Sequence, residues 1–287
     1  MIVVTGASGQ LGRLVIRELL KSHPAGQLAA AVRSPEKVAD FADLGVHIHK
    51  ADYTRPDTLA TAFSGADKVL FISANEVGRR VSQHANVITA AKEAGVGLVG
   101  YVSILHAAGS PLNLAEEHRQ TEALLAESGV PHVLLRNGWY TENYTGGIPT
   151  ALQYGTLMGC AGDGKISSAT RADFAAAAAA VMSADGQAGK VYELAGDEAY
   201  TLSEFAAELS AQAGKQVSYQ NLSEDAYAQA LQNAGVPAPF AMTLAQSETG
   251  ASQGGLFDDS KTLSKLIGRP TTPLRESIQA ALNAMAG

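Results

Sequence analysis

Three evenly spaced glycines near the start of the chain are suited to holding a phosphate group. Gly6, Gly9 and Gly12 follow directly after the apolar run IVVT at residues 2–5, and apolar residues then recur at helical spacing. The segment therefore predicts a strand, a glycine turn and a helix. Glycines let such a turn close tightly and let a pyrophosphate reach bare backbone N–H groups at the helix N-terminus. We expect a dinucleotide to bind here.

A guanidinium group stands where the second predicted strand ends. Residues 28–32 predict that strand, and Arg33 follows it directly. Folds that prefer NAD place an acid about 20 residues past the glycines, where it bonds the ribose 2′-hydroxyl. A cation instead favours a 2′-phosphate, which arginine can hold with two parallel hydrogen bonds. Arg33 therefore predicts NADPH, the alternative being a solvated arginine at the start of a loop.

Small polar residues follow the third and fourth predicted strands. Asp52 stands where it could accept a bond from an adenine amino group, or could simply cap a turn. Ser73, Ala74 and Asn75 follow the fourth strand. They are placed to line the ribose and nicotinamide side of a crevice, and they are equally suited to forming a turn.

Short strands alternate with helical segments through the first half of the chain. This rhythm predicts an α/β fold with a Rossmann-type, doubly wound parallel sheet, whose ligand lies at the carboxyl edge of the strands. The predicted strands are residues 2–5, 28–32, 46–51, 68–72, 98–102 and 132–136.

The rhythm becomes irregular after Arg136. Residues 1–136 therefore predict an NADP-binding domain, and residues 137–287 predict a smaller, mostly C-terminal α/β substrate-binding part. A strand near 190–196 is expected to rejoin the sheet, so the boundary is discontinuous. Beyond it the pattern indicates helices and loops, with a capping box at Thr201–Glu204.

The amino-acid composition limits which binding partners and which cellular location we expect for the protein. The formal net charge is −7 and no lysine- or arginine-rich run occurs, so neither nucleic acid nor an anionic membrane surface is expected as a partner. The only cysteine, Cys160, fits a reducing cytoplasm and is expected to be a small core residue rather than a nucleophile. The first strand begins at residue 2, which leaves no room for a leader peptide, and no membrane span or metal site is expected. The sequence leaves open whether the protein forms a homo-oligomer.

The usual acid of short-chain dehydrogenases has no counterpart here. Those enzymes carry Tyr-x-x-x-Lys, yet no tyrosine in this chain has lysine four residues later. The corresponding positions after Tyr101, Tyr140 and Tyr192 are leucine, tyrosine and glycine. A simple ketone gains much from a matched general acid, because its reduction makes a basic alkoxide. A quinone becomes aromatic on reduction, so positioning and one hydrogen bond suffice.

Residues 136–143 (RNGWYTEN) place an aromatic pair between two asparagines directly after the sixth strand. Together with GASGQLG at residues 6–12, this segment resembles the NmrA-like branch of the atypical short-chain dehydrogenases. The resemblance covers essentially the whole chain. Further matching segments are residues 72–78 (ISANEVG), Leu105-His106, 161–173 (AGDGKISSATRAD), 191–196 (VYELAG) and 254–268 (GGLFDDSKTLSKLIG).

The resemblance implies a flavin-free, metal-free enzyme that binds NADPH and reduces a small quinone by direct hydride transfer. It implies a set of cofactor-binding residues in the glycine loop, after the second and fourth strands, and after the sixth. These are Gly6, Ala7, Ser8, Gly9, Gln10, Leu11, Arg33, Ser73, Ala74, Asn75, Asn137, Gly138, Trp139, Tyr140, Thr141 and Glu142. The family pattern has serine where this chain has Ala74, which leaves only a backbone role there.

For the substrate, the expected catalytic residues are Tyr140 and Asn143. Asn143 can donate an amide N–H to a quinone oxygen without titrating, and Tyr140 can stack or donate. Trp139 and Tyr144 are expected in the pocket wall or the core. The alternative for all four is a structural loop.

Two other functions fit the missing acid. A triarylmethane dye is a carbocation and accepts hydride with no proton, so a dye reductase is one alternative. A non-catalytic regulator that senses NADP(H) is the other.

Overall fold

The computed structural model describes residues 1–286, which fall into two compact units. Unit 1 comprises residues 1–107, 117–137 and 171–192. Unit 2 comprises residues 108–116, 138–170 and 193 onward.

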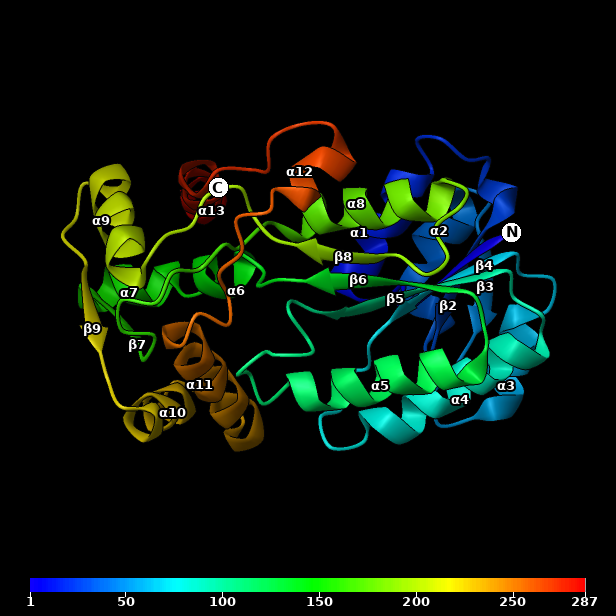
Figure 1. The fold of residues 1–287 in the computed structure, drawn as a ribbon. Coiled ribbons are helices and arrows are strands. Elements are labelled where there is room, and N and C mark those ends of the chain that lie inside the picture. The colour runs from blue at the N-terminus through cyan, green and yellow to red at the C-terminus, as the bar shows by residue number, and fades with distance from the viewer. Residues whose placement is uncertain (287) are drawn as a thin grey trace. The chain divides into compact units, whose positions relative to one another are not determined.

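A seven-stranded sheet forms the centre of unit 1 (Figure 1). Its order is β3-β2-β1-β4-β5-β6-β8, and the pairs from β3 through β6 are parallel. The strands are β1 (Ile2–Thr5), β2 (Leu28–Val32), β3 (His47–Lys50), β4 (Lys68–Ile72), β5 (Leu98–Ile104), β6 (His132–Asn137) and β8 (Val191–Leu194), the last of which spans the boundary between the units. The strand order reverses between β1 and β4, which is where such sheets bind ligands. The doubly wound parallel sheet predicted from the sequence is confirmed.

The first strands are continuous apolar runs because both faces of the sheet are covered. Every residue of β1 (IVVT) and of β2 (LAAAV) is buried. Parallel strands between two helical layers have no solvent face, so they lack the alternation typical of exposed strands. This is why their limits were readable from the sequence.

Helices cover the two faces of this sheet (Figure 1). On one side α1 (Gln10–Leu19) packs against α8 (Arg171–Ser183), and on the other lie α3 (Pro56–Phe63), α4 (Arg80–Glu93) and α5 (Ala115–Ser128). The short α2 (Ala39–Asp43) and the 3₁₀ turns Ala25–Gln27 and Pro35–Val38 complete the set. Phe71 and Tyr101 of the sheet pack with Leu59 and Phe63 in the core of this unit.

Unit 2 is mainly helical around a small parallel sheet. The two strands are β7 (Thr156–Gly159) and β9 (Ser218–Asn221). The sequence did not reveal either strand, because each has four residues and β9 (SYQN) carries no apolar alternation. The helices are α6 (Glu142–Thr145), α7 (Ile148–Tyr154), α9 (Leu202–Ala213), α10 (Glu224–Asn233), α11 (Ala238–Ser252), α12 (Thr262–Ile267) and α13 (Leu274–Ala286). The predicted capping box forms at the start of α9, where Thr201 and Glu204 exchange hydrogen bonds.

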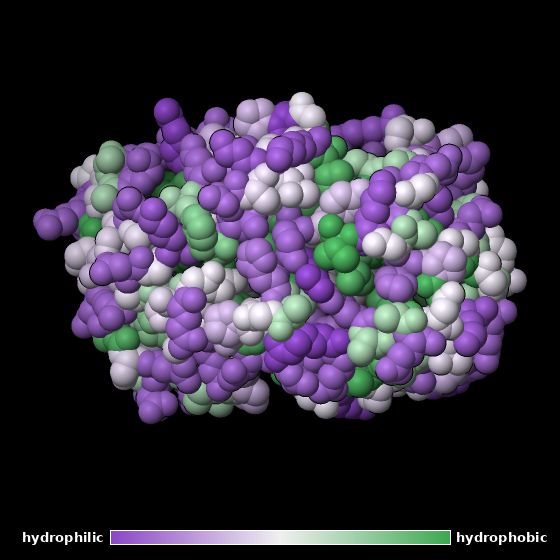
Figure 2. Space-filling view, viewed as in Figure 1, coloured by the Kyte–Doolittle hydropathy of each residue, from purple (hydrophilic) through white to green (hydrophobic). Residues whose placement is uncertain are grey.

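Hydrophilic residues dominate the face drawn in Figure 2, and hydrophobic residues appear there only in small groups. Among residues 1–286, every helix is too short or too polar to cross a bilayer.

Candidate functional site

The glycine turn leads from β1 into α1. Gly6 has a φ of +61°, and its carbonyl accepts the Gly9 N–H at 2.9 Å. A Cβ at Gly12 would lie 2.5 Å from the Gly6 carbonyl oxygen, so glycine is required for the helix to approach the turn this closely. Within α1, Gly9 supplies no side-chain cap and the first turn holds no acid. The first N–H groups of the helix are therefore left for an anion.

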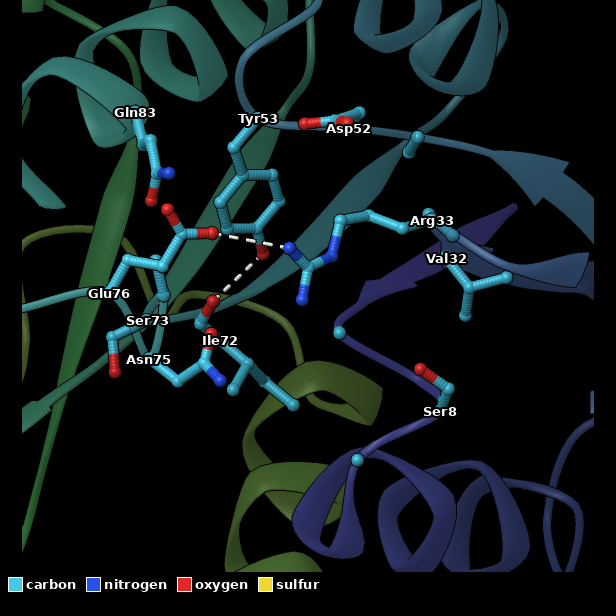
Figure 3. Close-up of a pocket in the computed structure, with 15 residues that line it drawn as sticks. Ser8, Val32, Arg33, Asp52, Tyr53, Ile72, Ser73, Asn75, Glu76 and Gln83 are labelled. Carbon is cyan, nitrogen blue, oxygen red and sulfur yellow. Dashed lines mark hydrogen bonds and ion pairs between the residues drawn. The ribbon is translucent and has the colours of Figure 1, made fainter. Parts of the chain in front are cut away.

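A cavity of about 260 Å³ lies at the carboxyl ends of β1, β2, β3 and β4 (Figure 3). Seven of the predicted cofactor residues line it: Gly6, Ser8, Gly9, Arg33, Ser73, Ala74 and Asn75. The neighbouring Ala7 and Leu11 are buried in the packing of the turn instead, and Gln10 opens α1. The structure thus brings together three segments, residues 6–9, Arg33 and residues 73–75, that are far apart in the sequence.

Arg33 reaches across this cavity toward the opposite wall (Figure 3). Its Nη1 lies 3.2 Å from Glu76 Oε1, and its side chain is 61% exposed. The other oxygen of Glu76 lies 3.1 Å from Arg79. The Thr54 backbone N–H lowers the pKa of the Asp52 carboxyl, and the charge of Arg33 adds to that effect. A bound phosphate would compete with Glu76 for the Arg33 guanidinium.

The loop after β4 is held by its backbone. The Ala74 N–H donates to His84 Nε2 at 2.9 Å, and the Ala74 carbonyl accepts from Arg80 Nε at 2.6 Å. Both polar groups of the peptide are therefore fixed from α4, and no side chain is needed at position 74. This arrangement is consistent with a backbone role for that residue.

The residues behind the loop form a buried chain of hydrogen bonds. His84 Nδ1 donates to the Thr121 hydroxyl at 2.8 Å, and that hydroxyl donates to the Glu117 carbonyl at 2.7 Å. Burial lowers the pKa of His84 to about 3, and the nearby charge of Arg80 adds to the effect. The histidine is therefore neutral, with its proton on Nδ1 and its Nε2 free to accept. Glu117 Oε1 also accepts the N–H groups of Gly78 and Arg80, so α5 anchors the end of the loop that leads into α4.

Three polar residues that line the cavity were not predicted from the sequence. They are Tyr53, Glu76 and Gln83. The Tyr53 hydroxyl donates to the Ile72 carbonyl at 2.8 Å, which ties the third strand's loop to the fourth strand. Gln83 is 4% exposed, and its Oε1 has no partner among the residues that the structure describes. An acceptor left unpaired in a cavity wall fits a ligand N–H, and the amide or amine of a dinucleotide supplies one.

The predicted residues after β6 fall on both sides of the unit boundary. Asn137 ends β6 in unit 1, where its carbonyl accepts the Leu105 N–H at 2.9 Å. Residues 138–143 begin the next segment of unit 2. There Ala169 donates to the Trp139 carbonyl at 3.1 Å and accepts from the Thr141 N–H at 2.9 Å. Residues 139–141 are therefore held by a backbone bridge to Ala169, and Glu142 and Asn143 begin α6.

A second cavity, of about 300 Å³, lies within unit 2. Its lining includes Trp139, Asn143 and Tyr144 but not Tyr140. Tyr140 is half-buried at the bridge to Ala169. Thr141 bonds the Ser168 hydroxyl at 2.8 Å through its own hydroxyl.

Among residues 1–286 there is no group of three histidine, cysteine, aspartate or glutamate side chains that could hold a metal ion.

The family model described as NAD(P)H-binding matches residues 6–185 of this chain. The chain belongs to this family. An NmrA-like oxidoreductase of Aspergillus flavus is 29% identical over 98% of the chain and 94% of its own length. The membership and the NmrA-like character inferred from the sequence are thus confirmed.

Two solved structures match the whole chain closely. One is the NADPH-dependent quinone oxidoreductase QOR2 of Escherichia coli complexed with NADPH, with 57% identity and a TM-score of 0.96 over 99% of this chain and 100% of that one. The other is the triphenylmethane reductase of Citrobacter sp. complexed with NADP(H), with 40% identity and a TM-score of 0.94 over 98% and 100% of the two chains.

Proposed function

We propose that this protein reduces quinones with NADPH by direct hydride transfer, without a flavin or a metal. The observation that carries the proposal is the 57% identity with the NADPH-bound Escherichia coli quinone oxidoreductase across essentially the whole of both chains. The triphenylmethane reductase of Citrobacter sp. is less similar to this chain, at 40% identity.

The cavity of unit 1 fits NADPH chemically. The bare N–H groups at the start of α1 suit the pyrophosphate, and Arg33 suits the 2′-phosphate. The Ala74 peptide is fixed by its hydrogen bonds and gives the ligand a rigid surface to contact. The unpaired Gln83 Oε1 can accept a hydrogen bond from an N–H group of the ligand. When bound, NADPH supplies the hydride; the residues of the chain bind and orient it.

On the acceptor side, we propose that Tyr140 and Asn143 contact the quinone. Asn143 is exposed in unit 2, and its amide N–H can bond a quinone oxygen at any pH. Tyr140 offers a half-exposed ring for stacking. A quinone, one hydride and one proton give the hydroquinone, and the aromatic product anion is weakly basic. The proton can then come from solvent, which explains how the chain manages without Tyr-x-x-x-Lys.

Reduction of triarylmethane dyes is the second candidate, because the Citrobacter reductase matches the chain along its whole length. The carbocation of such a dye needs no proton. We also propose a cytoplasmic location, which the single, buried cysteine favours.

The test is the rate of NADPH consumption by purified, flavin-free protein with a benzoquinone and, separately, with a cationic triarylmethane dye. We expect turnover with the quinone that needs no added flavin and exceeds turnover with the dye. Faster reduction of the dye would favour the second candidate. Tight NADPH binding with no turnover of either acceptor would show a regulator and overturn the proposal.

A further inference from the structure

Among the described residues, two acids line the cavity of unit 1, Asp52 and Glu76. The Asp52 Oδ1 is used within its own turn, where it accepts the Thr54 backbone N–H at 2.9 Å and the Thr54 hydroxyl at 2.8 Å. Glu76 instead faces across the cavity, and its carboxyl group points toward the Arg33 guanidinium (Figure 3). Glu76 is therefore the acid that a ligand meets beside Arg33.

The loop between β4 and α4 presents Glu76 in a fixed position. The peptides of Ala74 and Gly78, which lie on either side of it, are both anchored by side chains of α4 and α5. The Glu76 carbonyl accepts the Arg79 N–H at 3.0 Å, and the Glu76 Oε2 lies 3.1 Å from Arg79 Nη1. A carboxylate held in this way loses little conformational freedom when it binds a ligand.

The two nicotinamide cofactors differ at one position of the adenosine ribose. NADPH carries a phosphate on the 2′-oxygen, and NADH carries a free hydroxyl there. Folds that prefer NAD use an acid after the second strand to accept that hydroxyl. In this chain Arg33 occupies that point, but Glu76 reaches the guanidinium from the opposite wall, with its Oε1 3.2 Å from Arg33 Nη1. A group that binds to Arg33 therefore also meets an acid.

A carboxylate has opposite effects on a hydroxyl and on a phosphate. Because its two oxygens accept several hydrogen bonds, Glu76 can keep its ion pair with Arg33 and still accept a ribose O–H. A phosphate brings negative charge, which the carboxylate repels, and it also needs the guanidinium for itself. The Arg33–Glu76 pair can therefore stay closed around a hydroxyl but must open for a phosphate.

We propose that Glu76 is a second residue that determines cofactor choice: it accepts the adenosine 2′-hydroxyl of NADH, and it weakens the binding of NADPH. The protein thus takes NADH as a second hydride donor, while Arg33 keeps the preference for NADPH. The inference rests on the cofactor site of the proposed function. Glu76 is a specificity residue, and it takes no part in moving the hydride.

The experiment measures dissociation constants by isothermal titration, without an acceptor, for the wild type and for Glu76→Gln. The ligands are NADH, NADPH and 2′-deoxy-NADH, whose adenosine ribose lacks the hydroxyl. Glutamine keeps the size of the Glu76 side chain while removing its charge. The matched control is Glu18→Gln, because Glu18 also pairs with a cation three residues later, Lys21, and lies outside the cavity.

We expect Glu76→Gln to raise the dissociation constant for NADH about 3- to 10-fold, because a neutral acceptor replaces a charged one. The same variant should lower the dissociation constant for NADPH by a similar factor, since the repulsion of the phosphate is gone. The wild type should bind 2′-deoxy-NADH about 10- to 30-fold more weakly than NADH, and in Glu76→Gln this difference should shrink to about threefold. Glu18→Gln should match the wild type with all three ligands.

A purely structural role in the loop would make Glu76→Gln weaken both cofactors alike, and that result would overturn the inference. It is also wrong if the wild type binds NADH and 2′-deoxy-NADH equally, or does not bind NADH; this comparison needs no variant. Normal quinone turnover with unshifted affinities would leave the proposed function intact and remove this role of Glu76. Opposite shifts in a protein that reduces no quinone would support the inference and overturn the function instead.

Discussion

We propose that one side chain, Arg33, sets a preference for NADPH over NADH. It stands at the carboxyl end of β2 and shares the Glu76 carboxylate with Arg79. The Glu76 carboxylate holds the Arg33 guanidinium in place. Because the same carboxylate would repel a 2′-phosphate, a bound phosphate must displace Glu76 from Arg33.

Replacing Arg33 with aspartate should raise the dissociation constant for NADPH by about 30- to 100-fold, because a charge-assisted phosphate contact contributes roughly 2–3 kcal/mol. The dissociation constant for NADH should change little, since its ribose carries a hydroxyl. Isothermal titration of both cofactors measures this. Arg55→Asp is the control, because Arg55 pairs with Asp57 outside the cavity. Unchanged NADPH affinity would exclude Arg33 as the selector.

Glu248 also makes stability depend on pH. Burial raises its pKa from 4.5 to about 7, so the native state favours the protonated form. The groups facing it do not titrate in this interval, because burial raises the pKa of Cys160 to about 11, of Tyr219 to about 12, and of Tyr144 and Tyr227 as well. The stability linked to this proton is complete below pH 4.5 and is lost as the pH rises through about 7.

We therefore expect Glu248→Gln to be more stable than the wild type above neutral pH, by up to about 3 kcal/mol, and to approach it in acid. Urea unfolding at both pH values measures the difference. The exposed Glu127→Gln serves as the control and should show no such trend. A difference that is the same at both pH values would contradict the prediction.

At the level of elements, the site depends on how α4 and α5 hold the loop after β4. That loop, residues 73–79, has no regular structure of its own, yet His84, Arg80 and Glu117 bond its backbone at both ends. Fixing the loop before the cofactor arrives removes an entropy cost from binding.

Loss of the His84 anchor should therefore weaken cofactor binding without changing the acceptor's KM. We expect His84→Ala to raise the KM for NADPH about tenfold. Thr121→Val should have a smaller effect of the same kind, because it leaves the His84 Nδ1–H without an acceptor. Thr121→Ser keeps the hydroxyl and should behave as the wild type. Steady-state kinetics with each substrate varied in turn will separate the two KM values. Equal effects on both would indicate a general loss of structure instead.

At the scale of the whole molecule, the cavity that we propose for the nucleotide is lined entirely by residues of unit 1. A ligand that binds only the native state of this unit stabilises it by mass action. Unit 1 is formed by three separate segments, so its folding brings together parts of the chain that are spread over residues 1–192.

NADPH at about 100 times its dissociation constant should add roughly 2.7 kcal/mol to the stability of the unit, a rise in melting temperature of a few degrees. NADH at the same concentration should add less. Calorimetry with each cofactor tests this, and a melting temperature insensitive to NADPH would show that the cofactor does not bind the native unit. Arg33→Asp provides the control, since it should abolish the difference between the two cofactors.

The sequence by itself determined the strand, glycine turn and helix at residues 2–19, the parallel sheet, and the position of Arg33 at a strand end. Each of these follows from local pattern, because buried strands are apolar runs and a turn has fixed residue requirements. Local pattern does not indicate Tyr53 or Gln83, because their spacing carries no signal, and it does not indicate β7 or β9. Only the tertiary structure showed that the His84 ring accepts the Ala74 N–H. It also showed that Glu248 lines the same cavity as Tyr144, which lies over a hundred residues away in the sequence. Contacts between distant segments depend on how helices and strands pack, and periodicity in a sequence reports only the conformation of each segment by itself.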